Sequence, residues 1–421
     1  MTERLLQYIW QFQYFNAKVL STLEGEPIQI IHPGFYNTNQ GPDFTDAKMK
    51  IGNTLWAGSV ELHIRSGDWN NHKHSDDKNY RNVILHVVWQ QDIPLSLPFP
   101  TLVLEDRIPA LLLKKYDALM NRESFIACEN MIGQVNDLTL ASWKERLLIE
   151  RLQQKSTLVF DFLKKNNQHW EESFWWMLAK NFGGKVNGEA FEKIAQSIPL
   201  NILAKHKNQI HQLEGLLLGQ AGLLEQDFAE AYPQLLQKEY RFLKTKYRLK
   251  SISMPLYFLR MRPADFPSVR LAQLAMLVHN SLHLFSKIKE STILKDIKTL
   301  LAVTANDYWH YHYMPDAPSV YKKKNLGAAM INNILINTVC TVLFAYGQYY
   351  KEESYTNKAL QWMEEIAPEN NTITKGFARL QIANNNAFDS QSLIQLKNEY
   401  CNKKRCLSCS IGNQILKIPN P

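Results

Sequence analysis

The feature that most constrains the fold is a change in apolar spacing about a quarter of the way along the 421-residue chain. Short β-branched or alternating segments, separated by turn signals such as Gly52-Asn53, occupy residues 27–32, 46–51, 54–64 and 82–89, a pattern typical of strands. Beyond residue 110 the apolar side chains recur at helical intervals. We therefore expect an α+β protein with a small mixed sheet and flanking helices, followed by a large, mainly helical region.

The spacing also places the N-terminal elements. Residues 3–23 carry apolar side chains on one helical face, which predicts a first amphipathic helix. Ala47–Ile51 and Thr54–Ile64 predict the two arms of a β-hairpin. Val83–Trp89 is apolar enough to lie inside the sheet, and residues 101–104 predict a last strand.

The chain is expected to divide into an α/β domain at residues 1–110 and a mainly helical region at residues 111–421. Helical spacing predicts helices at 140–165, 170–181, 189–196, 208–219, 224–248, 269–288, 291–305, 327–349, 354–365 and 372–382. No low-complexity linker and no repeat of fixed period separates these segments. The parts are therefore expected to pack against one another.

Several features favour a cytoplasmic protein. No stretch approaches the roughly 20 uncharged apolar residues of a membrane span, and Met1–Gln11 carries acids and aromatics where a signal peptide needs an apolar run. Cys128, Cys340 and the three cysteines after residue 400 make an odd total, which favours reduced or metal-bound thiols over disulfides.

Net charge points weakly to an acidic partner. The formal charge of +8 favours contact with nucleic acid, although an ordinary solvated surface accounts for it equally well. Basic and aromatic residues alternate in RFLKTKYRLK at 241–250, as phosphate contact and base stacking require. The candidate nucleic-acid-binding residues are Arg241, Lys244, Lys246, Arg248, Arg262 and Arg270. A solvated helix face explains the first four, and internal salt bridges explain the last two.

The most informative polar residues lie in the expected sheet. Glu61 and His63 are two apart on one hairpin arm, so alternation places them on the same face. If Asp43 opens the adjacent strand, its carboxylate can reach them. Carboxylates of this kind hold Mg²⁺ or Mn²⁺, and the ion helps to generate the hydroxide that attacks phosphorus. The sequence therefore predicts a catalytic and metal site at Asp43 and Glu61, with His63 beside them.

Other candidates surround this pair. His72 and His74 have the donor type that a transition metal prefers, and Asp76 follows them, although a polar loop gives the same letters. His86 lies in an apolar strand, where a buried, hydrogen-bonded histidine is the alternative to a ligand. Glu24 is expected to follow the first helix and is a further candidate carboxylate, with a solvated helix end as the alternative.

A second cluster of metal-ligating residues lies near the C-terminus. Cys401, Cys406 and Cys409 form a C-x4-C-x2-C arrangement, and zinc or an iron–sulfur cluster normally takes four protein ligands. Cys128 is the obvious fourth ligand. Cys340 lies in an apolar run and is expected in the core. Plain reduced thiols remain the alternative to a metal centre.

The residues of the first hundred positions resemble those of the PD-(D/E)XK nuclease superfamily. The matching residues are Pro42-Asp43 at the start of one strand and Glu61-Leu62-His63 on the next, and the similarity covers about a quarter of the chain. His63 occupies the position of the superfamily's lysine. The resemblance implies a metal-dependent nuclease, but imidazole is mostly neutral where an ammonium is charged, so His63 would act as a base or a metal ligand.

Two wider resemblances extend the comparison. Some nucleases of this superfamily close their fold with an iron–sulfur cluster made from one distant and three C-terminal cysteines, although there the lone cysteine precedes the nuclease motif. The whole string, with GPDF, VELHI, HVVW, MRPxxFP, NNILINT and CLSCSIG, looks like members of an uncharacterised bacterial family carried as a domain of unknown function. That resemblance implies the domain plan and no activity.

The sequence therefore predicts a metal-dependent nuclease that hydrolyses DNA or RNA. A non-catalytic nucleic-acid- or protein-binding module with a degenerate nuclease-like fold is the alternative, favoured by the missing lysine. A different hydrolase that uses the histidine cluster is the third possibility.

Overall fold

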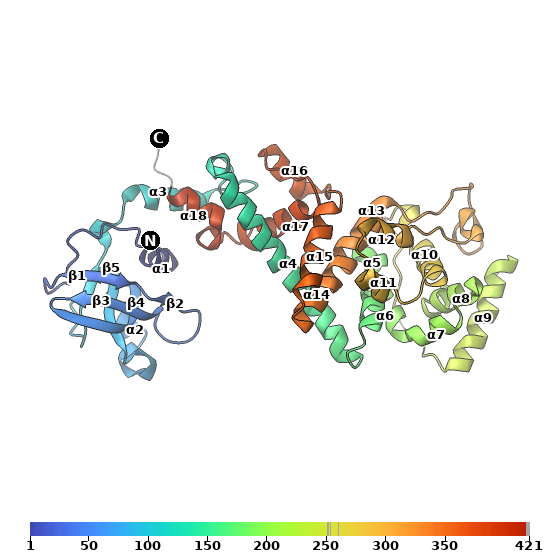
Figure 1. Ribbon diagram of the computed structural model, residues 1–421, viewed down its shortest axis with the longest axis horizontal. Helices are drawn as coiled ribbons and strands as arrows, with labels where there is room; N and C mark the ends of the chain where they lie inside the picture. Colours follow the sequence, from blue (N-terminus) through green and yellow to red (C-terminus); the bar gives the residue numbers. More distant parts are fainter. Residues whose placement is uncertain (251, 253, 260, 418–421) are drawn as a thin grey trace. The chain divides into compact units, whose positions relative to one another are not determined.

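The computed structural model describes residues 1–250, 252, 254–259 and 261–417, and its chain forms two compact units. Unit 1 consists of Met1–Trp143 and Lys397–Pro421, and unit 2 of Lys144–Leu396. This division differs from the expected domains at 1–110 and 111–421. The first unit extends to Trp143, and the segment from Lys397 onward belongs to it as well. The expected α+β class is confirmed, with the sheet in unit 1 and helices in both units (Figure 1).

Unit 1 is built on a mixed, six-stranded sheet. Its order is β1-β3-β4-β5-β6, with β2 paired to β3, and the first three strands of this order are antiparallel while β4, β5 and β6 run parallel. The strands are β1 (Ile28–His32), β2 (Phe35–Tyr36), β3 (Phe44–Ile51), β4 (Thr54–Arg65), β5 (Val83–Gln90) and β6 (Thr101–Val103). As expected, β5 is buried over most of its length between two neighbours.

A bulge in β3 sets the register beside the candidate site. Phe44 pairs with Val60 and Ala47 with Gly58, so β3 carries one residue more than β4 over this interval. Asp46 takes up the extra length with a left-handed φ of 56°. Both Phe44 and Ala47 therefore face the core, and Asp43 lies opposite Glu61.

The first helix is shorter than expected. Helix α1 (Glu3–Gln11) packs on β4 and buries Leu5, Leu6, Ile9 and Trp10, but the expected helix at 3–23 is wrong beyond residue 11. Trp10 donates its indole N–H to the carbonyl of Pro33, 2.9 Å away, and so ties the helix to the loop after β1. Left-handed backbone at Gln13 and Val19 ends the helical spacing that the apolar residues suggested.

The connection from β4 to β5 is a compact segment that the sequence did not reveal. It contains α2 (Asp68–Asn71) and the short helical turns η1 (His74–Asp76) and η2 (Lys78–Tyr80). Trp69 is buried and anchors the segment, and its indole N–H donates to the hydroxyl of Ser75 at 2.9 Å. The rest of unit 1 comprises η3 (Glu105–Arg107), α3 (Ala110–Asn121), η4 (Ile132–Gln134), η9 (Cys406–Ser408) and α18 (Ser410–Lys417).

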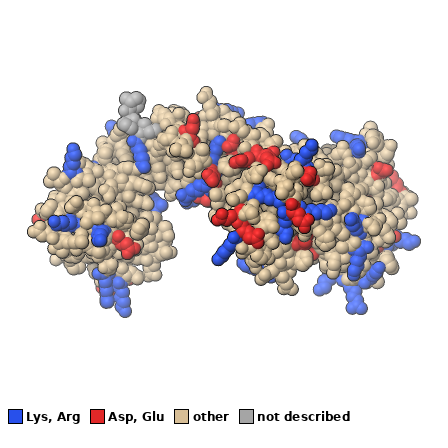
Figure 2. All heavy atoms as spheres, in the orientation of Figure 1, with Lys and Arg blue, Asp and Glu red and all other residues tan. Residues whose placement is uncertain are grey.

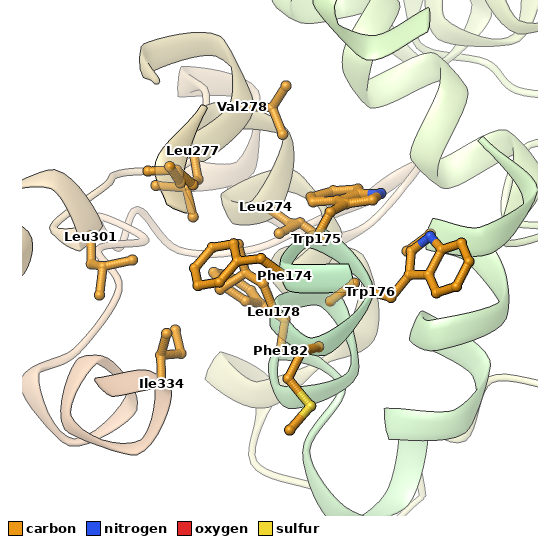
Figure 3. Close-up of a cluster of buried hydrophobic side chains, with 14 of the residues drawn as sticks. Phe174, Trp175, Trp176, Leu178, Phe182, Leu274, Leu277, Val278, Leu301 and Ile334 are labelled. Atoms are coloured by element: carbon orange, nitrogen blue, oxygen red, sulfur yellow. The ribbon is translucent and has the colours of Figure 1, made fainter. Parts of the chain in front are cut away.

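Unit 2 is helical apart from a two-stranded hairpin, β7 (His312–Met314) and β8 (Ala317–Pro318). Its aromatic core, shown in Figure 3, joins α5 to α10 through side chains such as Phe174, Trp175 and Leu274. The described helices are α4 (Asp137–Lys165, which begins in unit 1), α5 (Trp170–Phe182), α6 (Gly184–Ser197), α7 (Leu200–Lys205), α8 (Ile210–Gln220), α9 (Ala231–Tyr247), η5 (Pro263–Asp265), α10 (Pro267–Asn280), α11 (Leu284–Glu290), α12 (Leu294–Leu301), η6 (Asp307–His310), α13 (Ala328–Ile334), η7 (Leu335–Cys340), α14 (Thr341–Tyr350), α15 (Glu353–Glu365), α16 (Thr372–Arg379) and α17 (Ala387–Gln395). The last residue of unit 2 begins η8 (Leu396–Cys401), which otherwise belongs to unit 1.

Three of the expected helices differ most from those observed, and one of them, expected at 291–305, covers only Leu294–Leu301 as α12. The helix expected at 269–288 is broken, because His283 has a left-handed φ of 54° between α10 and α11. The helix expected at 224–248 begins only at Ala231.

One continuous helical stretch in the described part of the chain passes the length and composition test for a membrane span. An 18-residue window within Ala328–Tyr350 has a mean hydropathy of 1.7, so the expectation that no stretch is long and apolar enough is wrong. Sixty-seven per cent of this window is nevertheless buried inside the protein, where Ile334, Val339 and Leu343 pack in the core of unit 2. Burial of this kind is that of a core helix in a soluble protein. Cys340 lies in the same core, as expected.

Candidate functional site

Asp43 directly precedes β3, and two hydrogen bonds connect it to Glu61 and Leu62 on the neighbouring strand β4. The backbone N–H of Asp43 donates to Glu61 Oε2 at 3.0 Å, and the backbone N–H of Leu62 donates to Asp43 Oδ2 at 3.1 Å. Each carboxylate is therefore held by the backbone beside the other carboxylate. The expectation that Asp43 can reach Glu61 from the adjacent strand is confirmed.

Helix α1 supplies the polar groups around Asp43, and the sequence did not single them out. Gln7 is buried and donates its amide to Asp43 Oδ1 at 2.8 Å, while the hydroxyl of Tyr36 donates to Gln7 Oε1 at 3.3 Å. Glu3 and Arg4 lie near enough for their charges to act on Asp43. Glu24 is exposed in a turn beyond the helix, so the acid that α1 brings toward the site is Glu3.

Four imidazoles gather beside Glu61. His63 Nε2 lies 3.1 Å from His72 Nδ1, and His63 Nδ1 lies 2.9 Å from His86 Nε2. Glu61 Oε1 is 3.3 Å from His74 Nε2 and 3.6 Å from His63 Nε2. We refer to Asp43, Glu61, His63, His72, His74 and His86 as the carboxylate–imidazole cluster. Asp76 is exposed at the end of η1 and is not part of it.

Strand pairing explains how the cluster forms. Glu61 and His63 alternate onto one face of β4, and the parallel neighbour of Glu61 on β5 is His86, which is fully buried. His72 and His74 come from the segment between these strands, which Trp69 fixes against the same face. His74 stacks on Tyr80 with ring centroids 3.9 Å apart, and Trp69 packs edge-on against His63, so aromatic rings wall the cluster.

Burial dominates the electrostatics of this cluster. Burial, followed by the nearby charge of Asp43, raises the pKa of Glu61 to about 9, and burial raises the pKa of Asp43 to about 7. Burial and the neighbouring histidines lower the pKa of His63 to about 2 and that of His86 to about 4. The imidazoles of His63 and His86 are therefore neutral near pH 7, and a neutral imidazole can donate an electron pair.

The cysteine cluster forms within unit 1. Unit 1 contains Cys128 as well as Cys401, Cys406 and Cys409. Burial is the largest cause of the raised pKa of Cys401, and the charges of the other three thiols raise it further. Chain contacts also hold the segments together, since Lys397 Nζ donates to the carbonyl of Phe125 and Lys404 Nζ to that of Met120. The structure thus brings the distant cysteine close to the three C-terminal ones.

Burial favours the neutral thiol of Cys409, although hydrogen-bond donors also surround its sulfur. The backbone N–H groups of Ile411 and Gly412 and the indole of Trp143 are hydrogen-bond donors that favour its charged form, although burial raises its pKa. Burial raises the pKa of Cys128 to about 12 and that of Cys406 to about 11. Free thiols here would stay protonated, whereas a bound metal would deprotonate them.

Sulfur spacing limits what the cysteines can hold. In the described part of the chain, the group of metal-ligating side chains whose donor atoms all lie within 4.8 Å of one another is His63, His72 and His74, and no trio of cysteines meets this spacing. Tetrahedral Zn–S bonds of about 2.3 Å require sulfurs about 3.8 Å apart. A single zinc ion would therefore require the thiols to move closer together.

The candidate nucleic-acid-binding residues lie in unit 2, and their surroundings differ. Arg241, Lys246 and Arg248 are exposed at the end of α9 beside the exposed ring of Phe242, and Lys244 is partly buried there. Arg270 forms a salt bridge with Asp265 at 2.5 Å and also donates a hydrogen bond to Gln273. This is the internal salt bridge that was the alternative to phosphate binding.

Surface charge does not concentrate on the face that Figure 2 draws. Basic side chains are interspersed there with acidic ones. Arg262 is exposed in the segment before α10. The end of α9 therefore remains a candidate nucleic-acid-binding surface only because its exposed basic residues lie beside the exposed ring of Phe242.

The fold and the cluster together define an α+β protein whose N-terminal sheet carries a pair of interlocked carboxylates, Asp43 and Glu61, beside a group of histidines. The chain belongs to the family described as Protein of unknown function (DUF2851), whose model matches residues 3–372. This confirms the expected membership of an uncharacterised family, and the PD-(D/E)XK resemblance stays a prediction. No curated protein and no solved structure matches the chain. The matched span contains the whole carboxylate–imidazole cluster and Cys128, and ends before Cys401.

Proposed function

We propose that this protein is a metal-dependent phosphodiesterase that cleaves nucleic acid. The observation that carries the proposal is the interlocked pair of Asp43 and Glu61, of which Glu61 is buried and Asp43 half-buried, beside the buried imidazoles of His63, His74 and His86. A divalent ion there, such as Mg²⁺ or Mn²⁺, would lower the pKa of a bound water and neutralise charge on the phosphate. Burial of the Glu61 carboxylate beside that of Asp43 costs free energy without a cation, which is the expected signature of a site built for an ion.

In this proposal, Arg4 supplies the positive charge that the lysine of the PD-(D/E)XK motif would provide. His63 is neutral, so it cannot supply positive charge and instead acts as a base or a ligand. Arg4 is exposed on α1, its guanidinium lies 4.6 Å from the centre of the Tyr36 ring, and its charge lowers the pKa of Asp43. Arg4 is therefore the cation positioned to meet a substrate phosphate.

The test is cleavage of labelled single- and double-stranded DNA and RNA with Mg²⁺, Mn²⁺, Zn²⁺ or EDTA. Asp43→Asn and Glu61→Gln keep a carbonyl oxygen for the backbone N–H groups and remove the charge, so both variants should fold and lose cleavage. Asp76→Asn is the matched control, because Asp76 is exposed and outside the cluster, and it should cleave normally.

The alternative is a module that binds nucleic acid or protein without cleaving. The position of His63 and the exposed basic and aromatic residues at the end of α9 favour it. Binding of the labelled strands without cleavage under any metal would establish this alternative and overturn the phosphodiesterase.

The proposal includes a metal centre at Cys128, Cys401, Cys406 and Cys409. Zinc or an iron–sulfur cluster would take these four thiolates, and the wide sulfur spacing favours the larger cluster over a single ion. Such a centre would fasten the C-terminal segment to the rest of unit 1. Anaerobic purification followed by iron, sulfide and zinc analysis tests it, and protein with none of the three would leave plain thiols.

A cytoplasmic location is also part of the proposal. All five cysteines are free, which suits a reducing compartment. Fractionation of cells that produce the tagged protein tests this, and recovery with an exported or membrane fraction would contradict it.

A further inference from the structure

We infer that Glu61, His63, His72 and His74 form a four-ligand site for one transition-metal ion of the zinc or ferrous-iron class. The inference deepens the proposed function and rests on it only for the use of the ion in catalysis. It changes the expected ion from Mg²⁺, held by carboxylates, to one held mainly by imidazole.

The spacing of the four donor atoms fits such an ion. The separations are 3.1 Å between His63 Nε2 and His72 Nδ1, 3.3 Å between Glu61 Oε1 and His74 Nε2, and 3.6 Å between Glu61 Oε1 and His63 Nε2. Metal–nitrogen and metal–oxygen bonds of about 2.0–2.1 Å in a tetrahedron place ligands roughly 3.3 Å apart. The three imidazole donors lie within 4.8 Å of one another, and Glu61 Oε1 lies within 3.6 Å of two of them, so a small shift of Glu61 toward His72 would complete one coordination sphere.

The contact between Glu61 and His74 is close without being a hydrogen bond. His74 Nε2 is buried and has no hydrogen-bond partner, although Glu61 Oε1 lies 3.3 Å away. Buried polar atoms normally find partners, so an orphan at this distance requires an explanation. Two electron-pair donors that share a cation lie near each other without pointing at each other, which accounts for this arrangement.

Hydrogen bonds from surrounding groups orient His63 and Glu61 so that each can offer an electron pair to an ion. His63 Nδ1 can donate its proton to His86 Nε2 at 2.9 Å, which leaves an electron pair on His63 Nε2. Without an ion this pair accepts a hydrogen bond from His72 Nδ1, and an ion would take the place of that proton. The backbone N–H of Asp43 occupies Glu61 Oε2, so Oε1 is the oxygen that faces the imidazoles. His86 and the backbone of Asp43 thus orient ligands without touching the ion.

Ligand chemistry excludes Mg²⁺ as the preferred ion. Mg²⁺ demands octahedral oxygen ligands and keeps several waters, whereas imidazole suits zinc, iron, copper and nickel. Three of the four ligands are buried, and His72 is exposed. The ion and a substrate oxygen would therefore approach from the side of His72, where a neighbouring coordination position is open to solvent.

The test uses Co²⁺ as a spectroscopic substitute in the full-length protein. Tetrahedral Co²⁺ with nitrogen and oxygen ligands absorbs visible light far more strongly than octahedral Co²⁺, and thiolate ligation adds a separate near-ultraviolet band. Metal-free protein should therefore show intense visible bands that titrate to one equivalent and that excess Mg²⁺ does not displace. The band of Co²⁺ at the cysteines is subtracted with a Cys401→Ser sample.

Variants locate the ion. His72→Ala changes an exposed residue and should fold as the wild type does, and it should weaken Co²⁺ binding by at least about tenfold. Asp76→Asn, the exposed neighbour, should bind normally. Weak octahedral spectra, or unchanged affinity in His72→Ala with the fold intact by circular dichroism, would overturn the inference.

The same samples separate this inference from the proposed function. Intact tetrahedral Co²⁺ bands in a protein that cleaves no nucleic acid would support the metal site and overturn the phosphodiesterase. Cleavage that persists with Mg²⁺ in His72→Ala would support the phosphodiesterase and overturn the four-ligand site.

Discussion

Replacement of His74 by Phe should have opposite effects on stability with and without metal. In the metal-free protein, the buried His74 Nε2 has no partner, and an unsatisfied polar atom of this kind costs about 1–3 kcal/mol. Phe keeps the ring shape and the packing on Tyr80 and Trp69, at a misfit cost of roughly 1 kcal/mol. The metal-free variant should therefore be more stable than the wild type by about 1 kcal/mol.

Metal should reverse this order. An ion present at a hundred times its dissociation constant stabilises the wild type by about 2.7 kcal/mol. If loss of one ligand weakens binding about a hundredfold, the variant gains only about 0.4 kcal/mol under the same conditions. The variant should then be less stable than the wild type by roughly 1 kcal/mol.

Native-state hydrogen exchange by mass spectrometry over β4 and β5 measures these differences locally, which avoids the mixed unfolding of two units. The wild type and the His74→Phe variant would be compared in EDTA and in excess Zn²⁺. A variant that is destabilised in EDTA, or that gains as much protection from Zn²⁺ as the wild type, would refute the reasoning and leave His74 as an ordinary core residue.

Three further predictions concern other parts of the chain. Burial raises the pKa of Glu214 from 4.5 to about 7, so the unfolding free energy should fall by roughly 3 kcal/mol as pH rises through that interval, and Glu214→Gln should abolish the fall in urea titrations. Lys246→Ala should reduce the salt dependence of nucleic-acid binding by roughly one ion, measured by fluorescence anisotropy, whereas an unchanged slope would remove α9 from the interface. Cys128→Ser should lower the iron or zinc content of anaerobically purified protein, whereas equal content would exclude Cys128 as a ligand.

Local periodicity predicted the part of the site that lies on strands. Glu61 and His63 share a face because alternation is a strict property of a strand, and this required no knowledge of the partners. The burial of β5 followed in the same way from its continuous apolar run. These predictions succeeded because, along a strand, the face on which one side chain lies determines the face of each side chain that follows.

The positions of the loop histidines depend on tertiary packing. The polar segment after β4 gave only donor types for His72 and His74, because its short helical turns are set by the burial of Trp69 and not by a repeating pattern. The approach of Cys128 to the C-terminal cysteines was predicted from ligand number alone, while its spacing depends on contacts of Lys397 and Lys404.

The contribution of α1 was missed for a related reason. Gln7 lies on the apolar face of the helix, and its partner Asp43 is 36 residues away in the sequence. A polar residue within an apolar stripe was the available signal. The expected helix at 3–23 drew attention instead to Glu24, because apolar residues after Gln13 mimic helical spacing while the backbone turns.

The most direct measurement is the rate at which metal-free protein cleaves a fluorescent oligonucleotide as Zn²⁺, Mn²⁺ or Mg²⁺ is added in separate titrations. The account predicts no cleavage in EDTA, recovery with a transition-metal ion near one equivalent per chain, and no recovery in Glu61→Gln. Cleavage that survives EDTA, or that is equal in Glu61→Gln and the wild type, would contradict it.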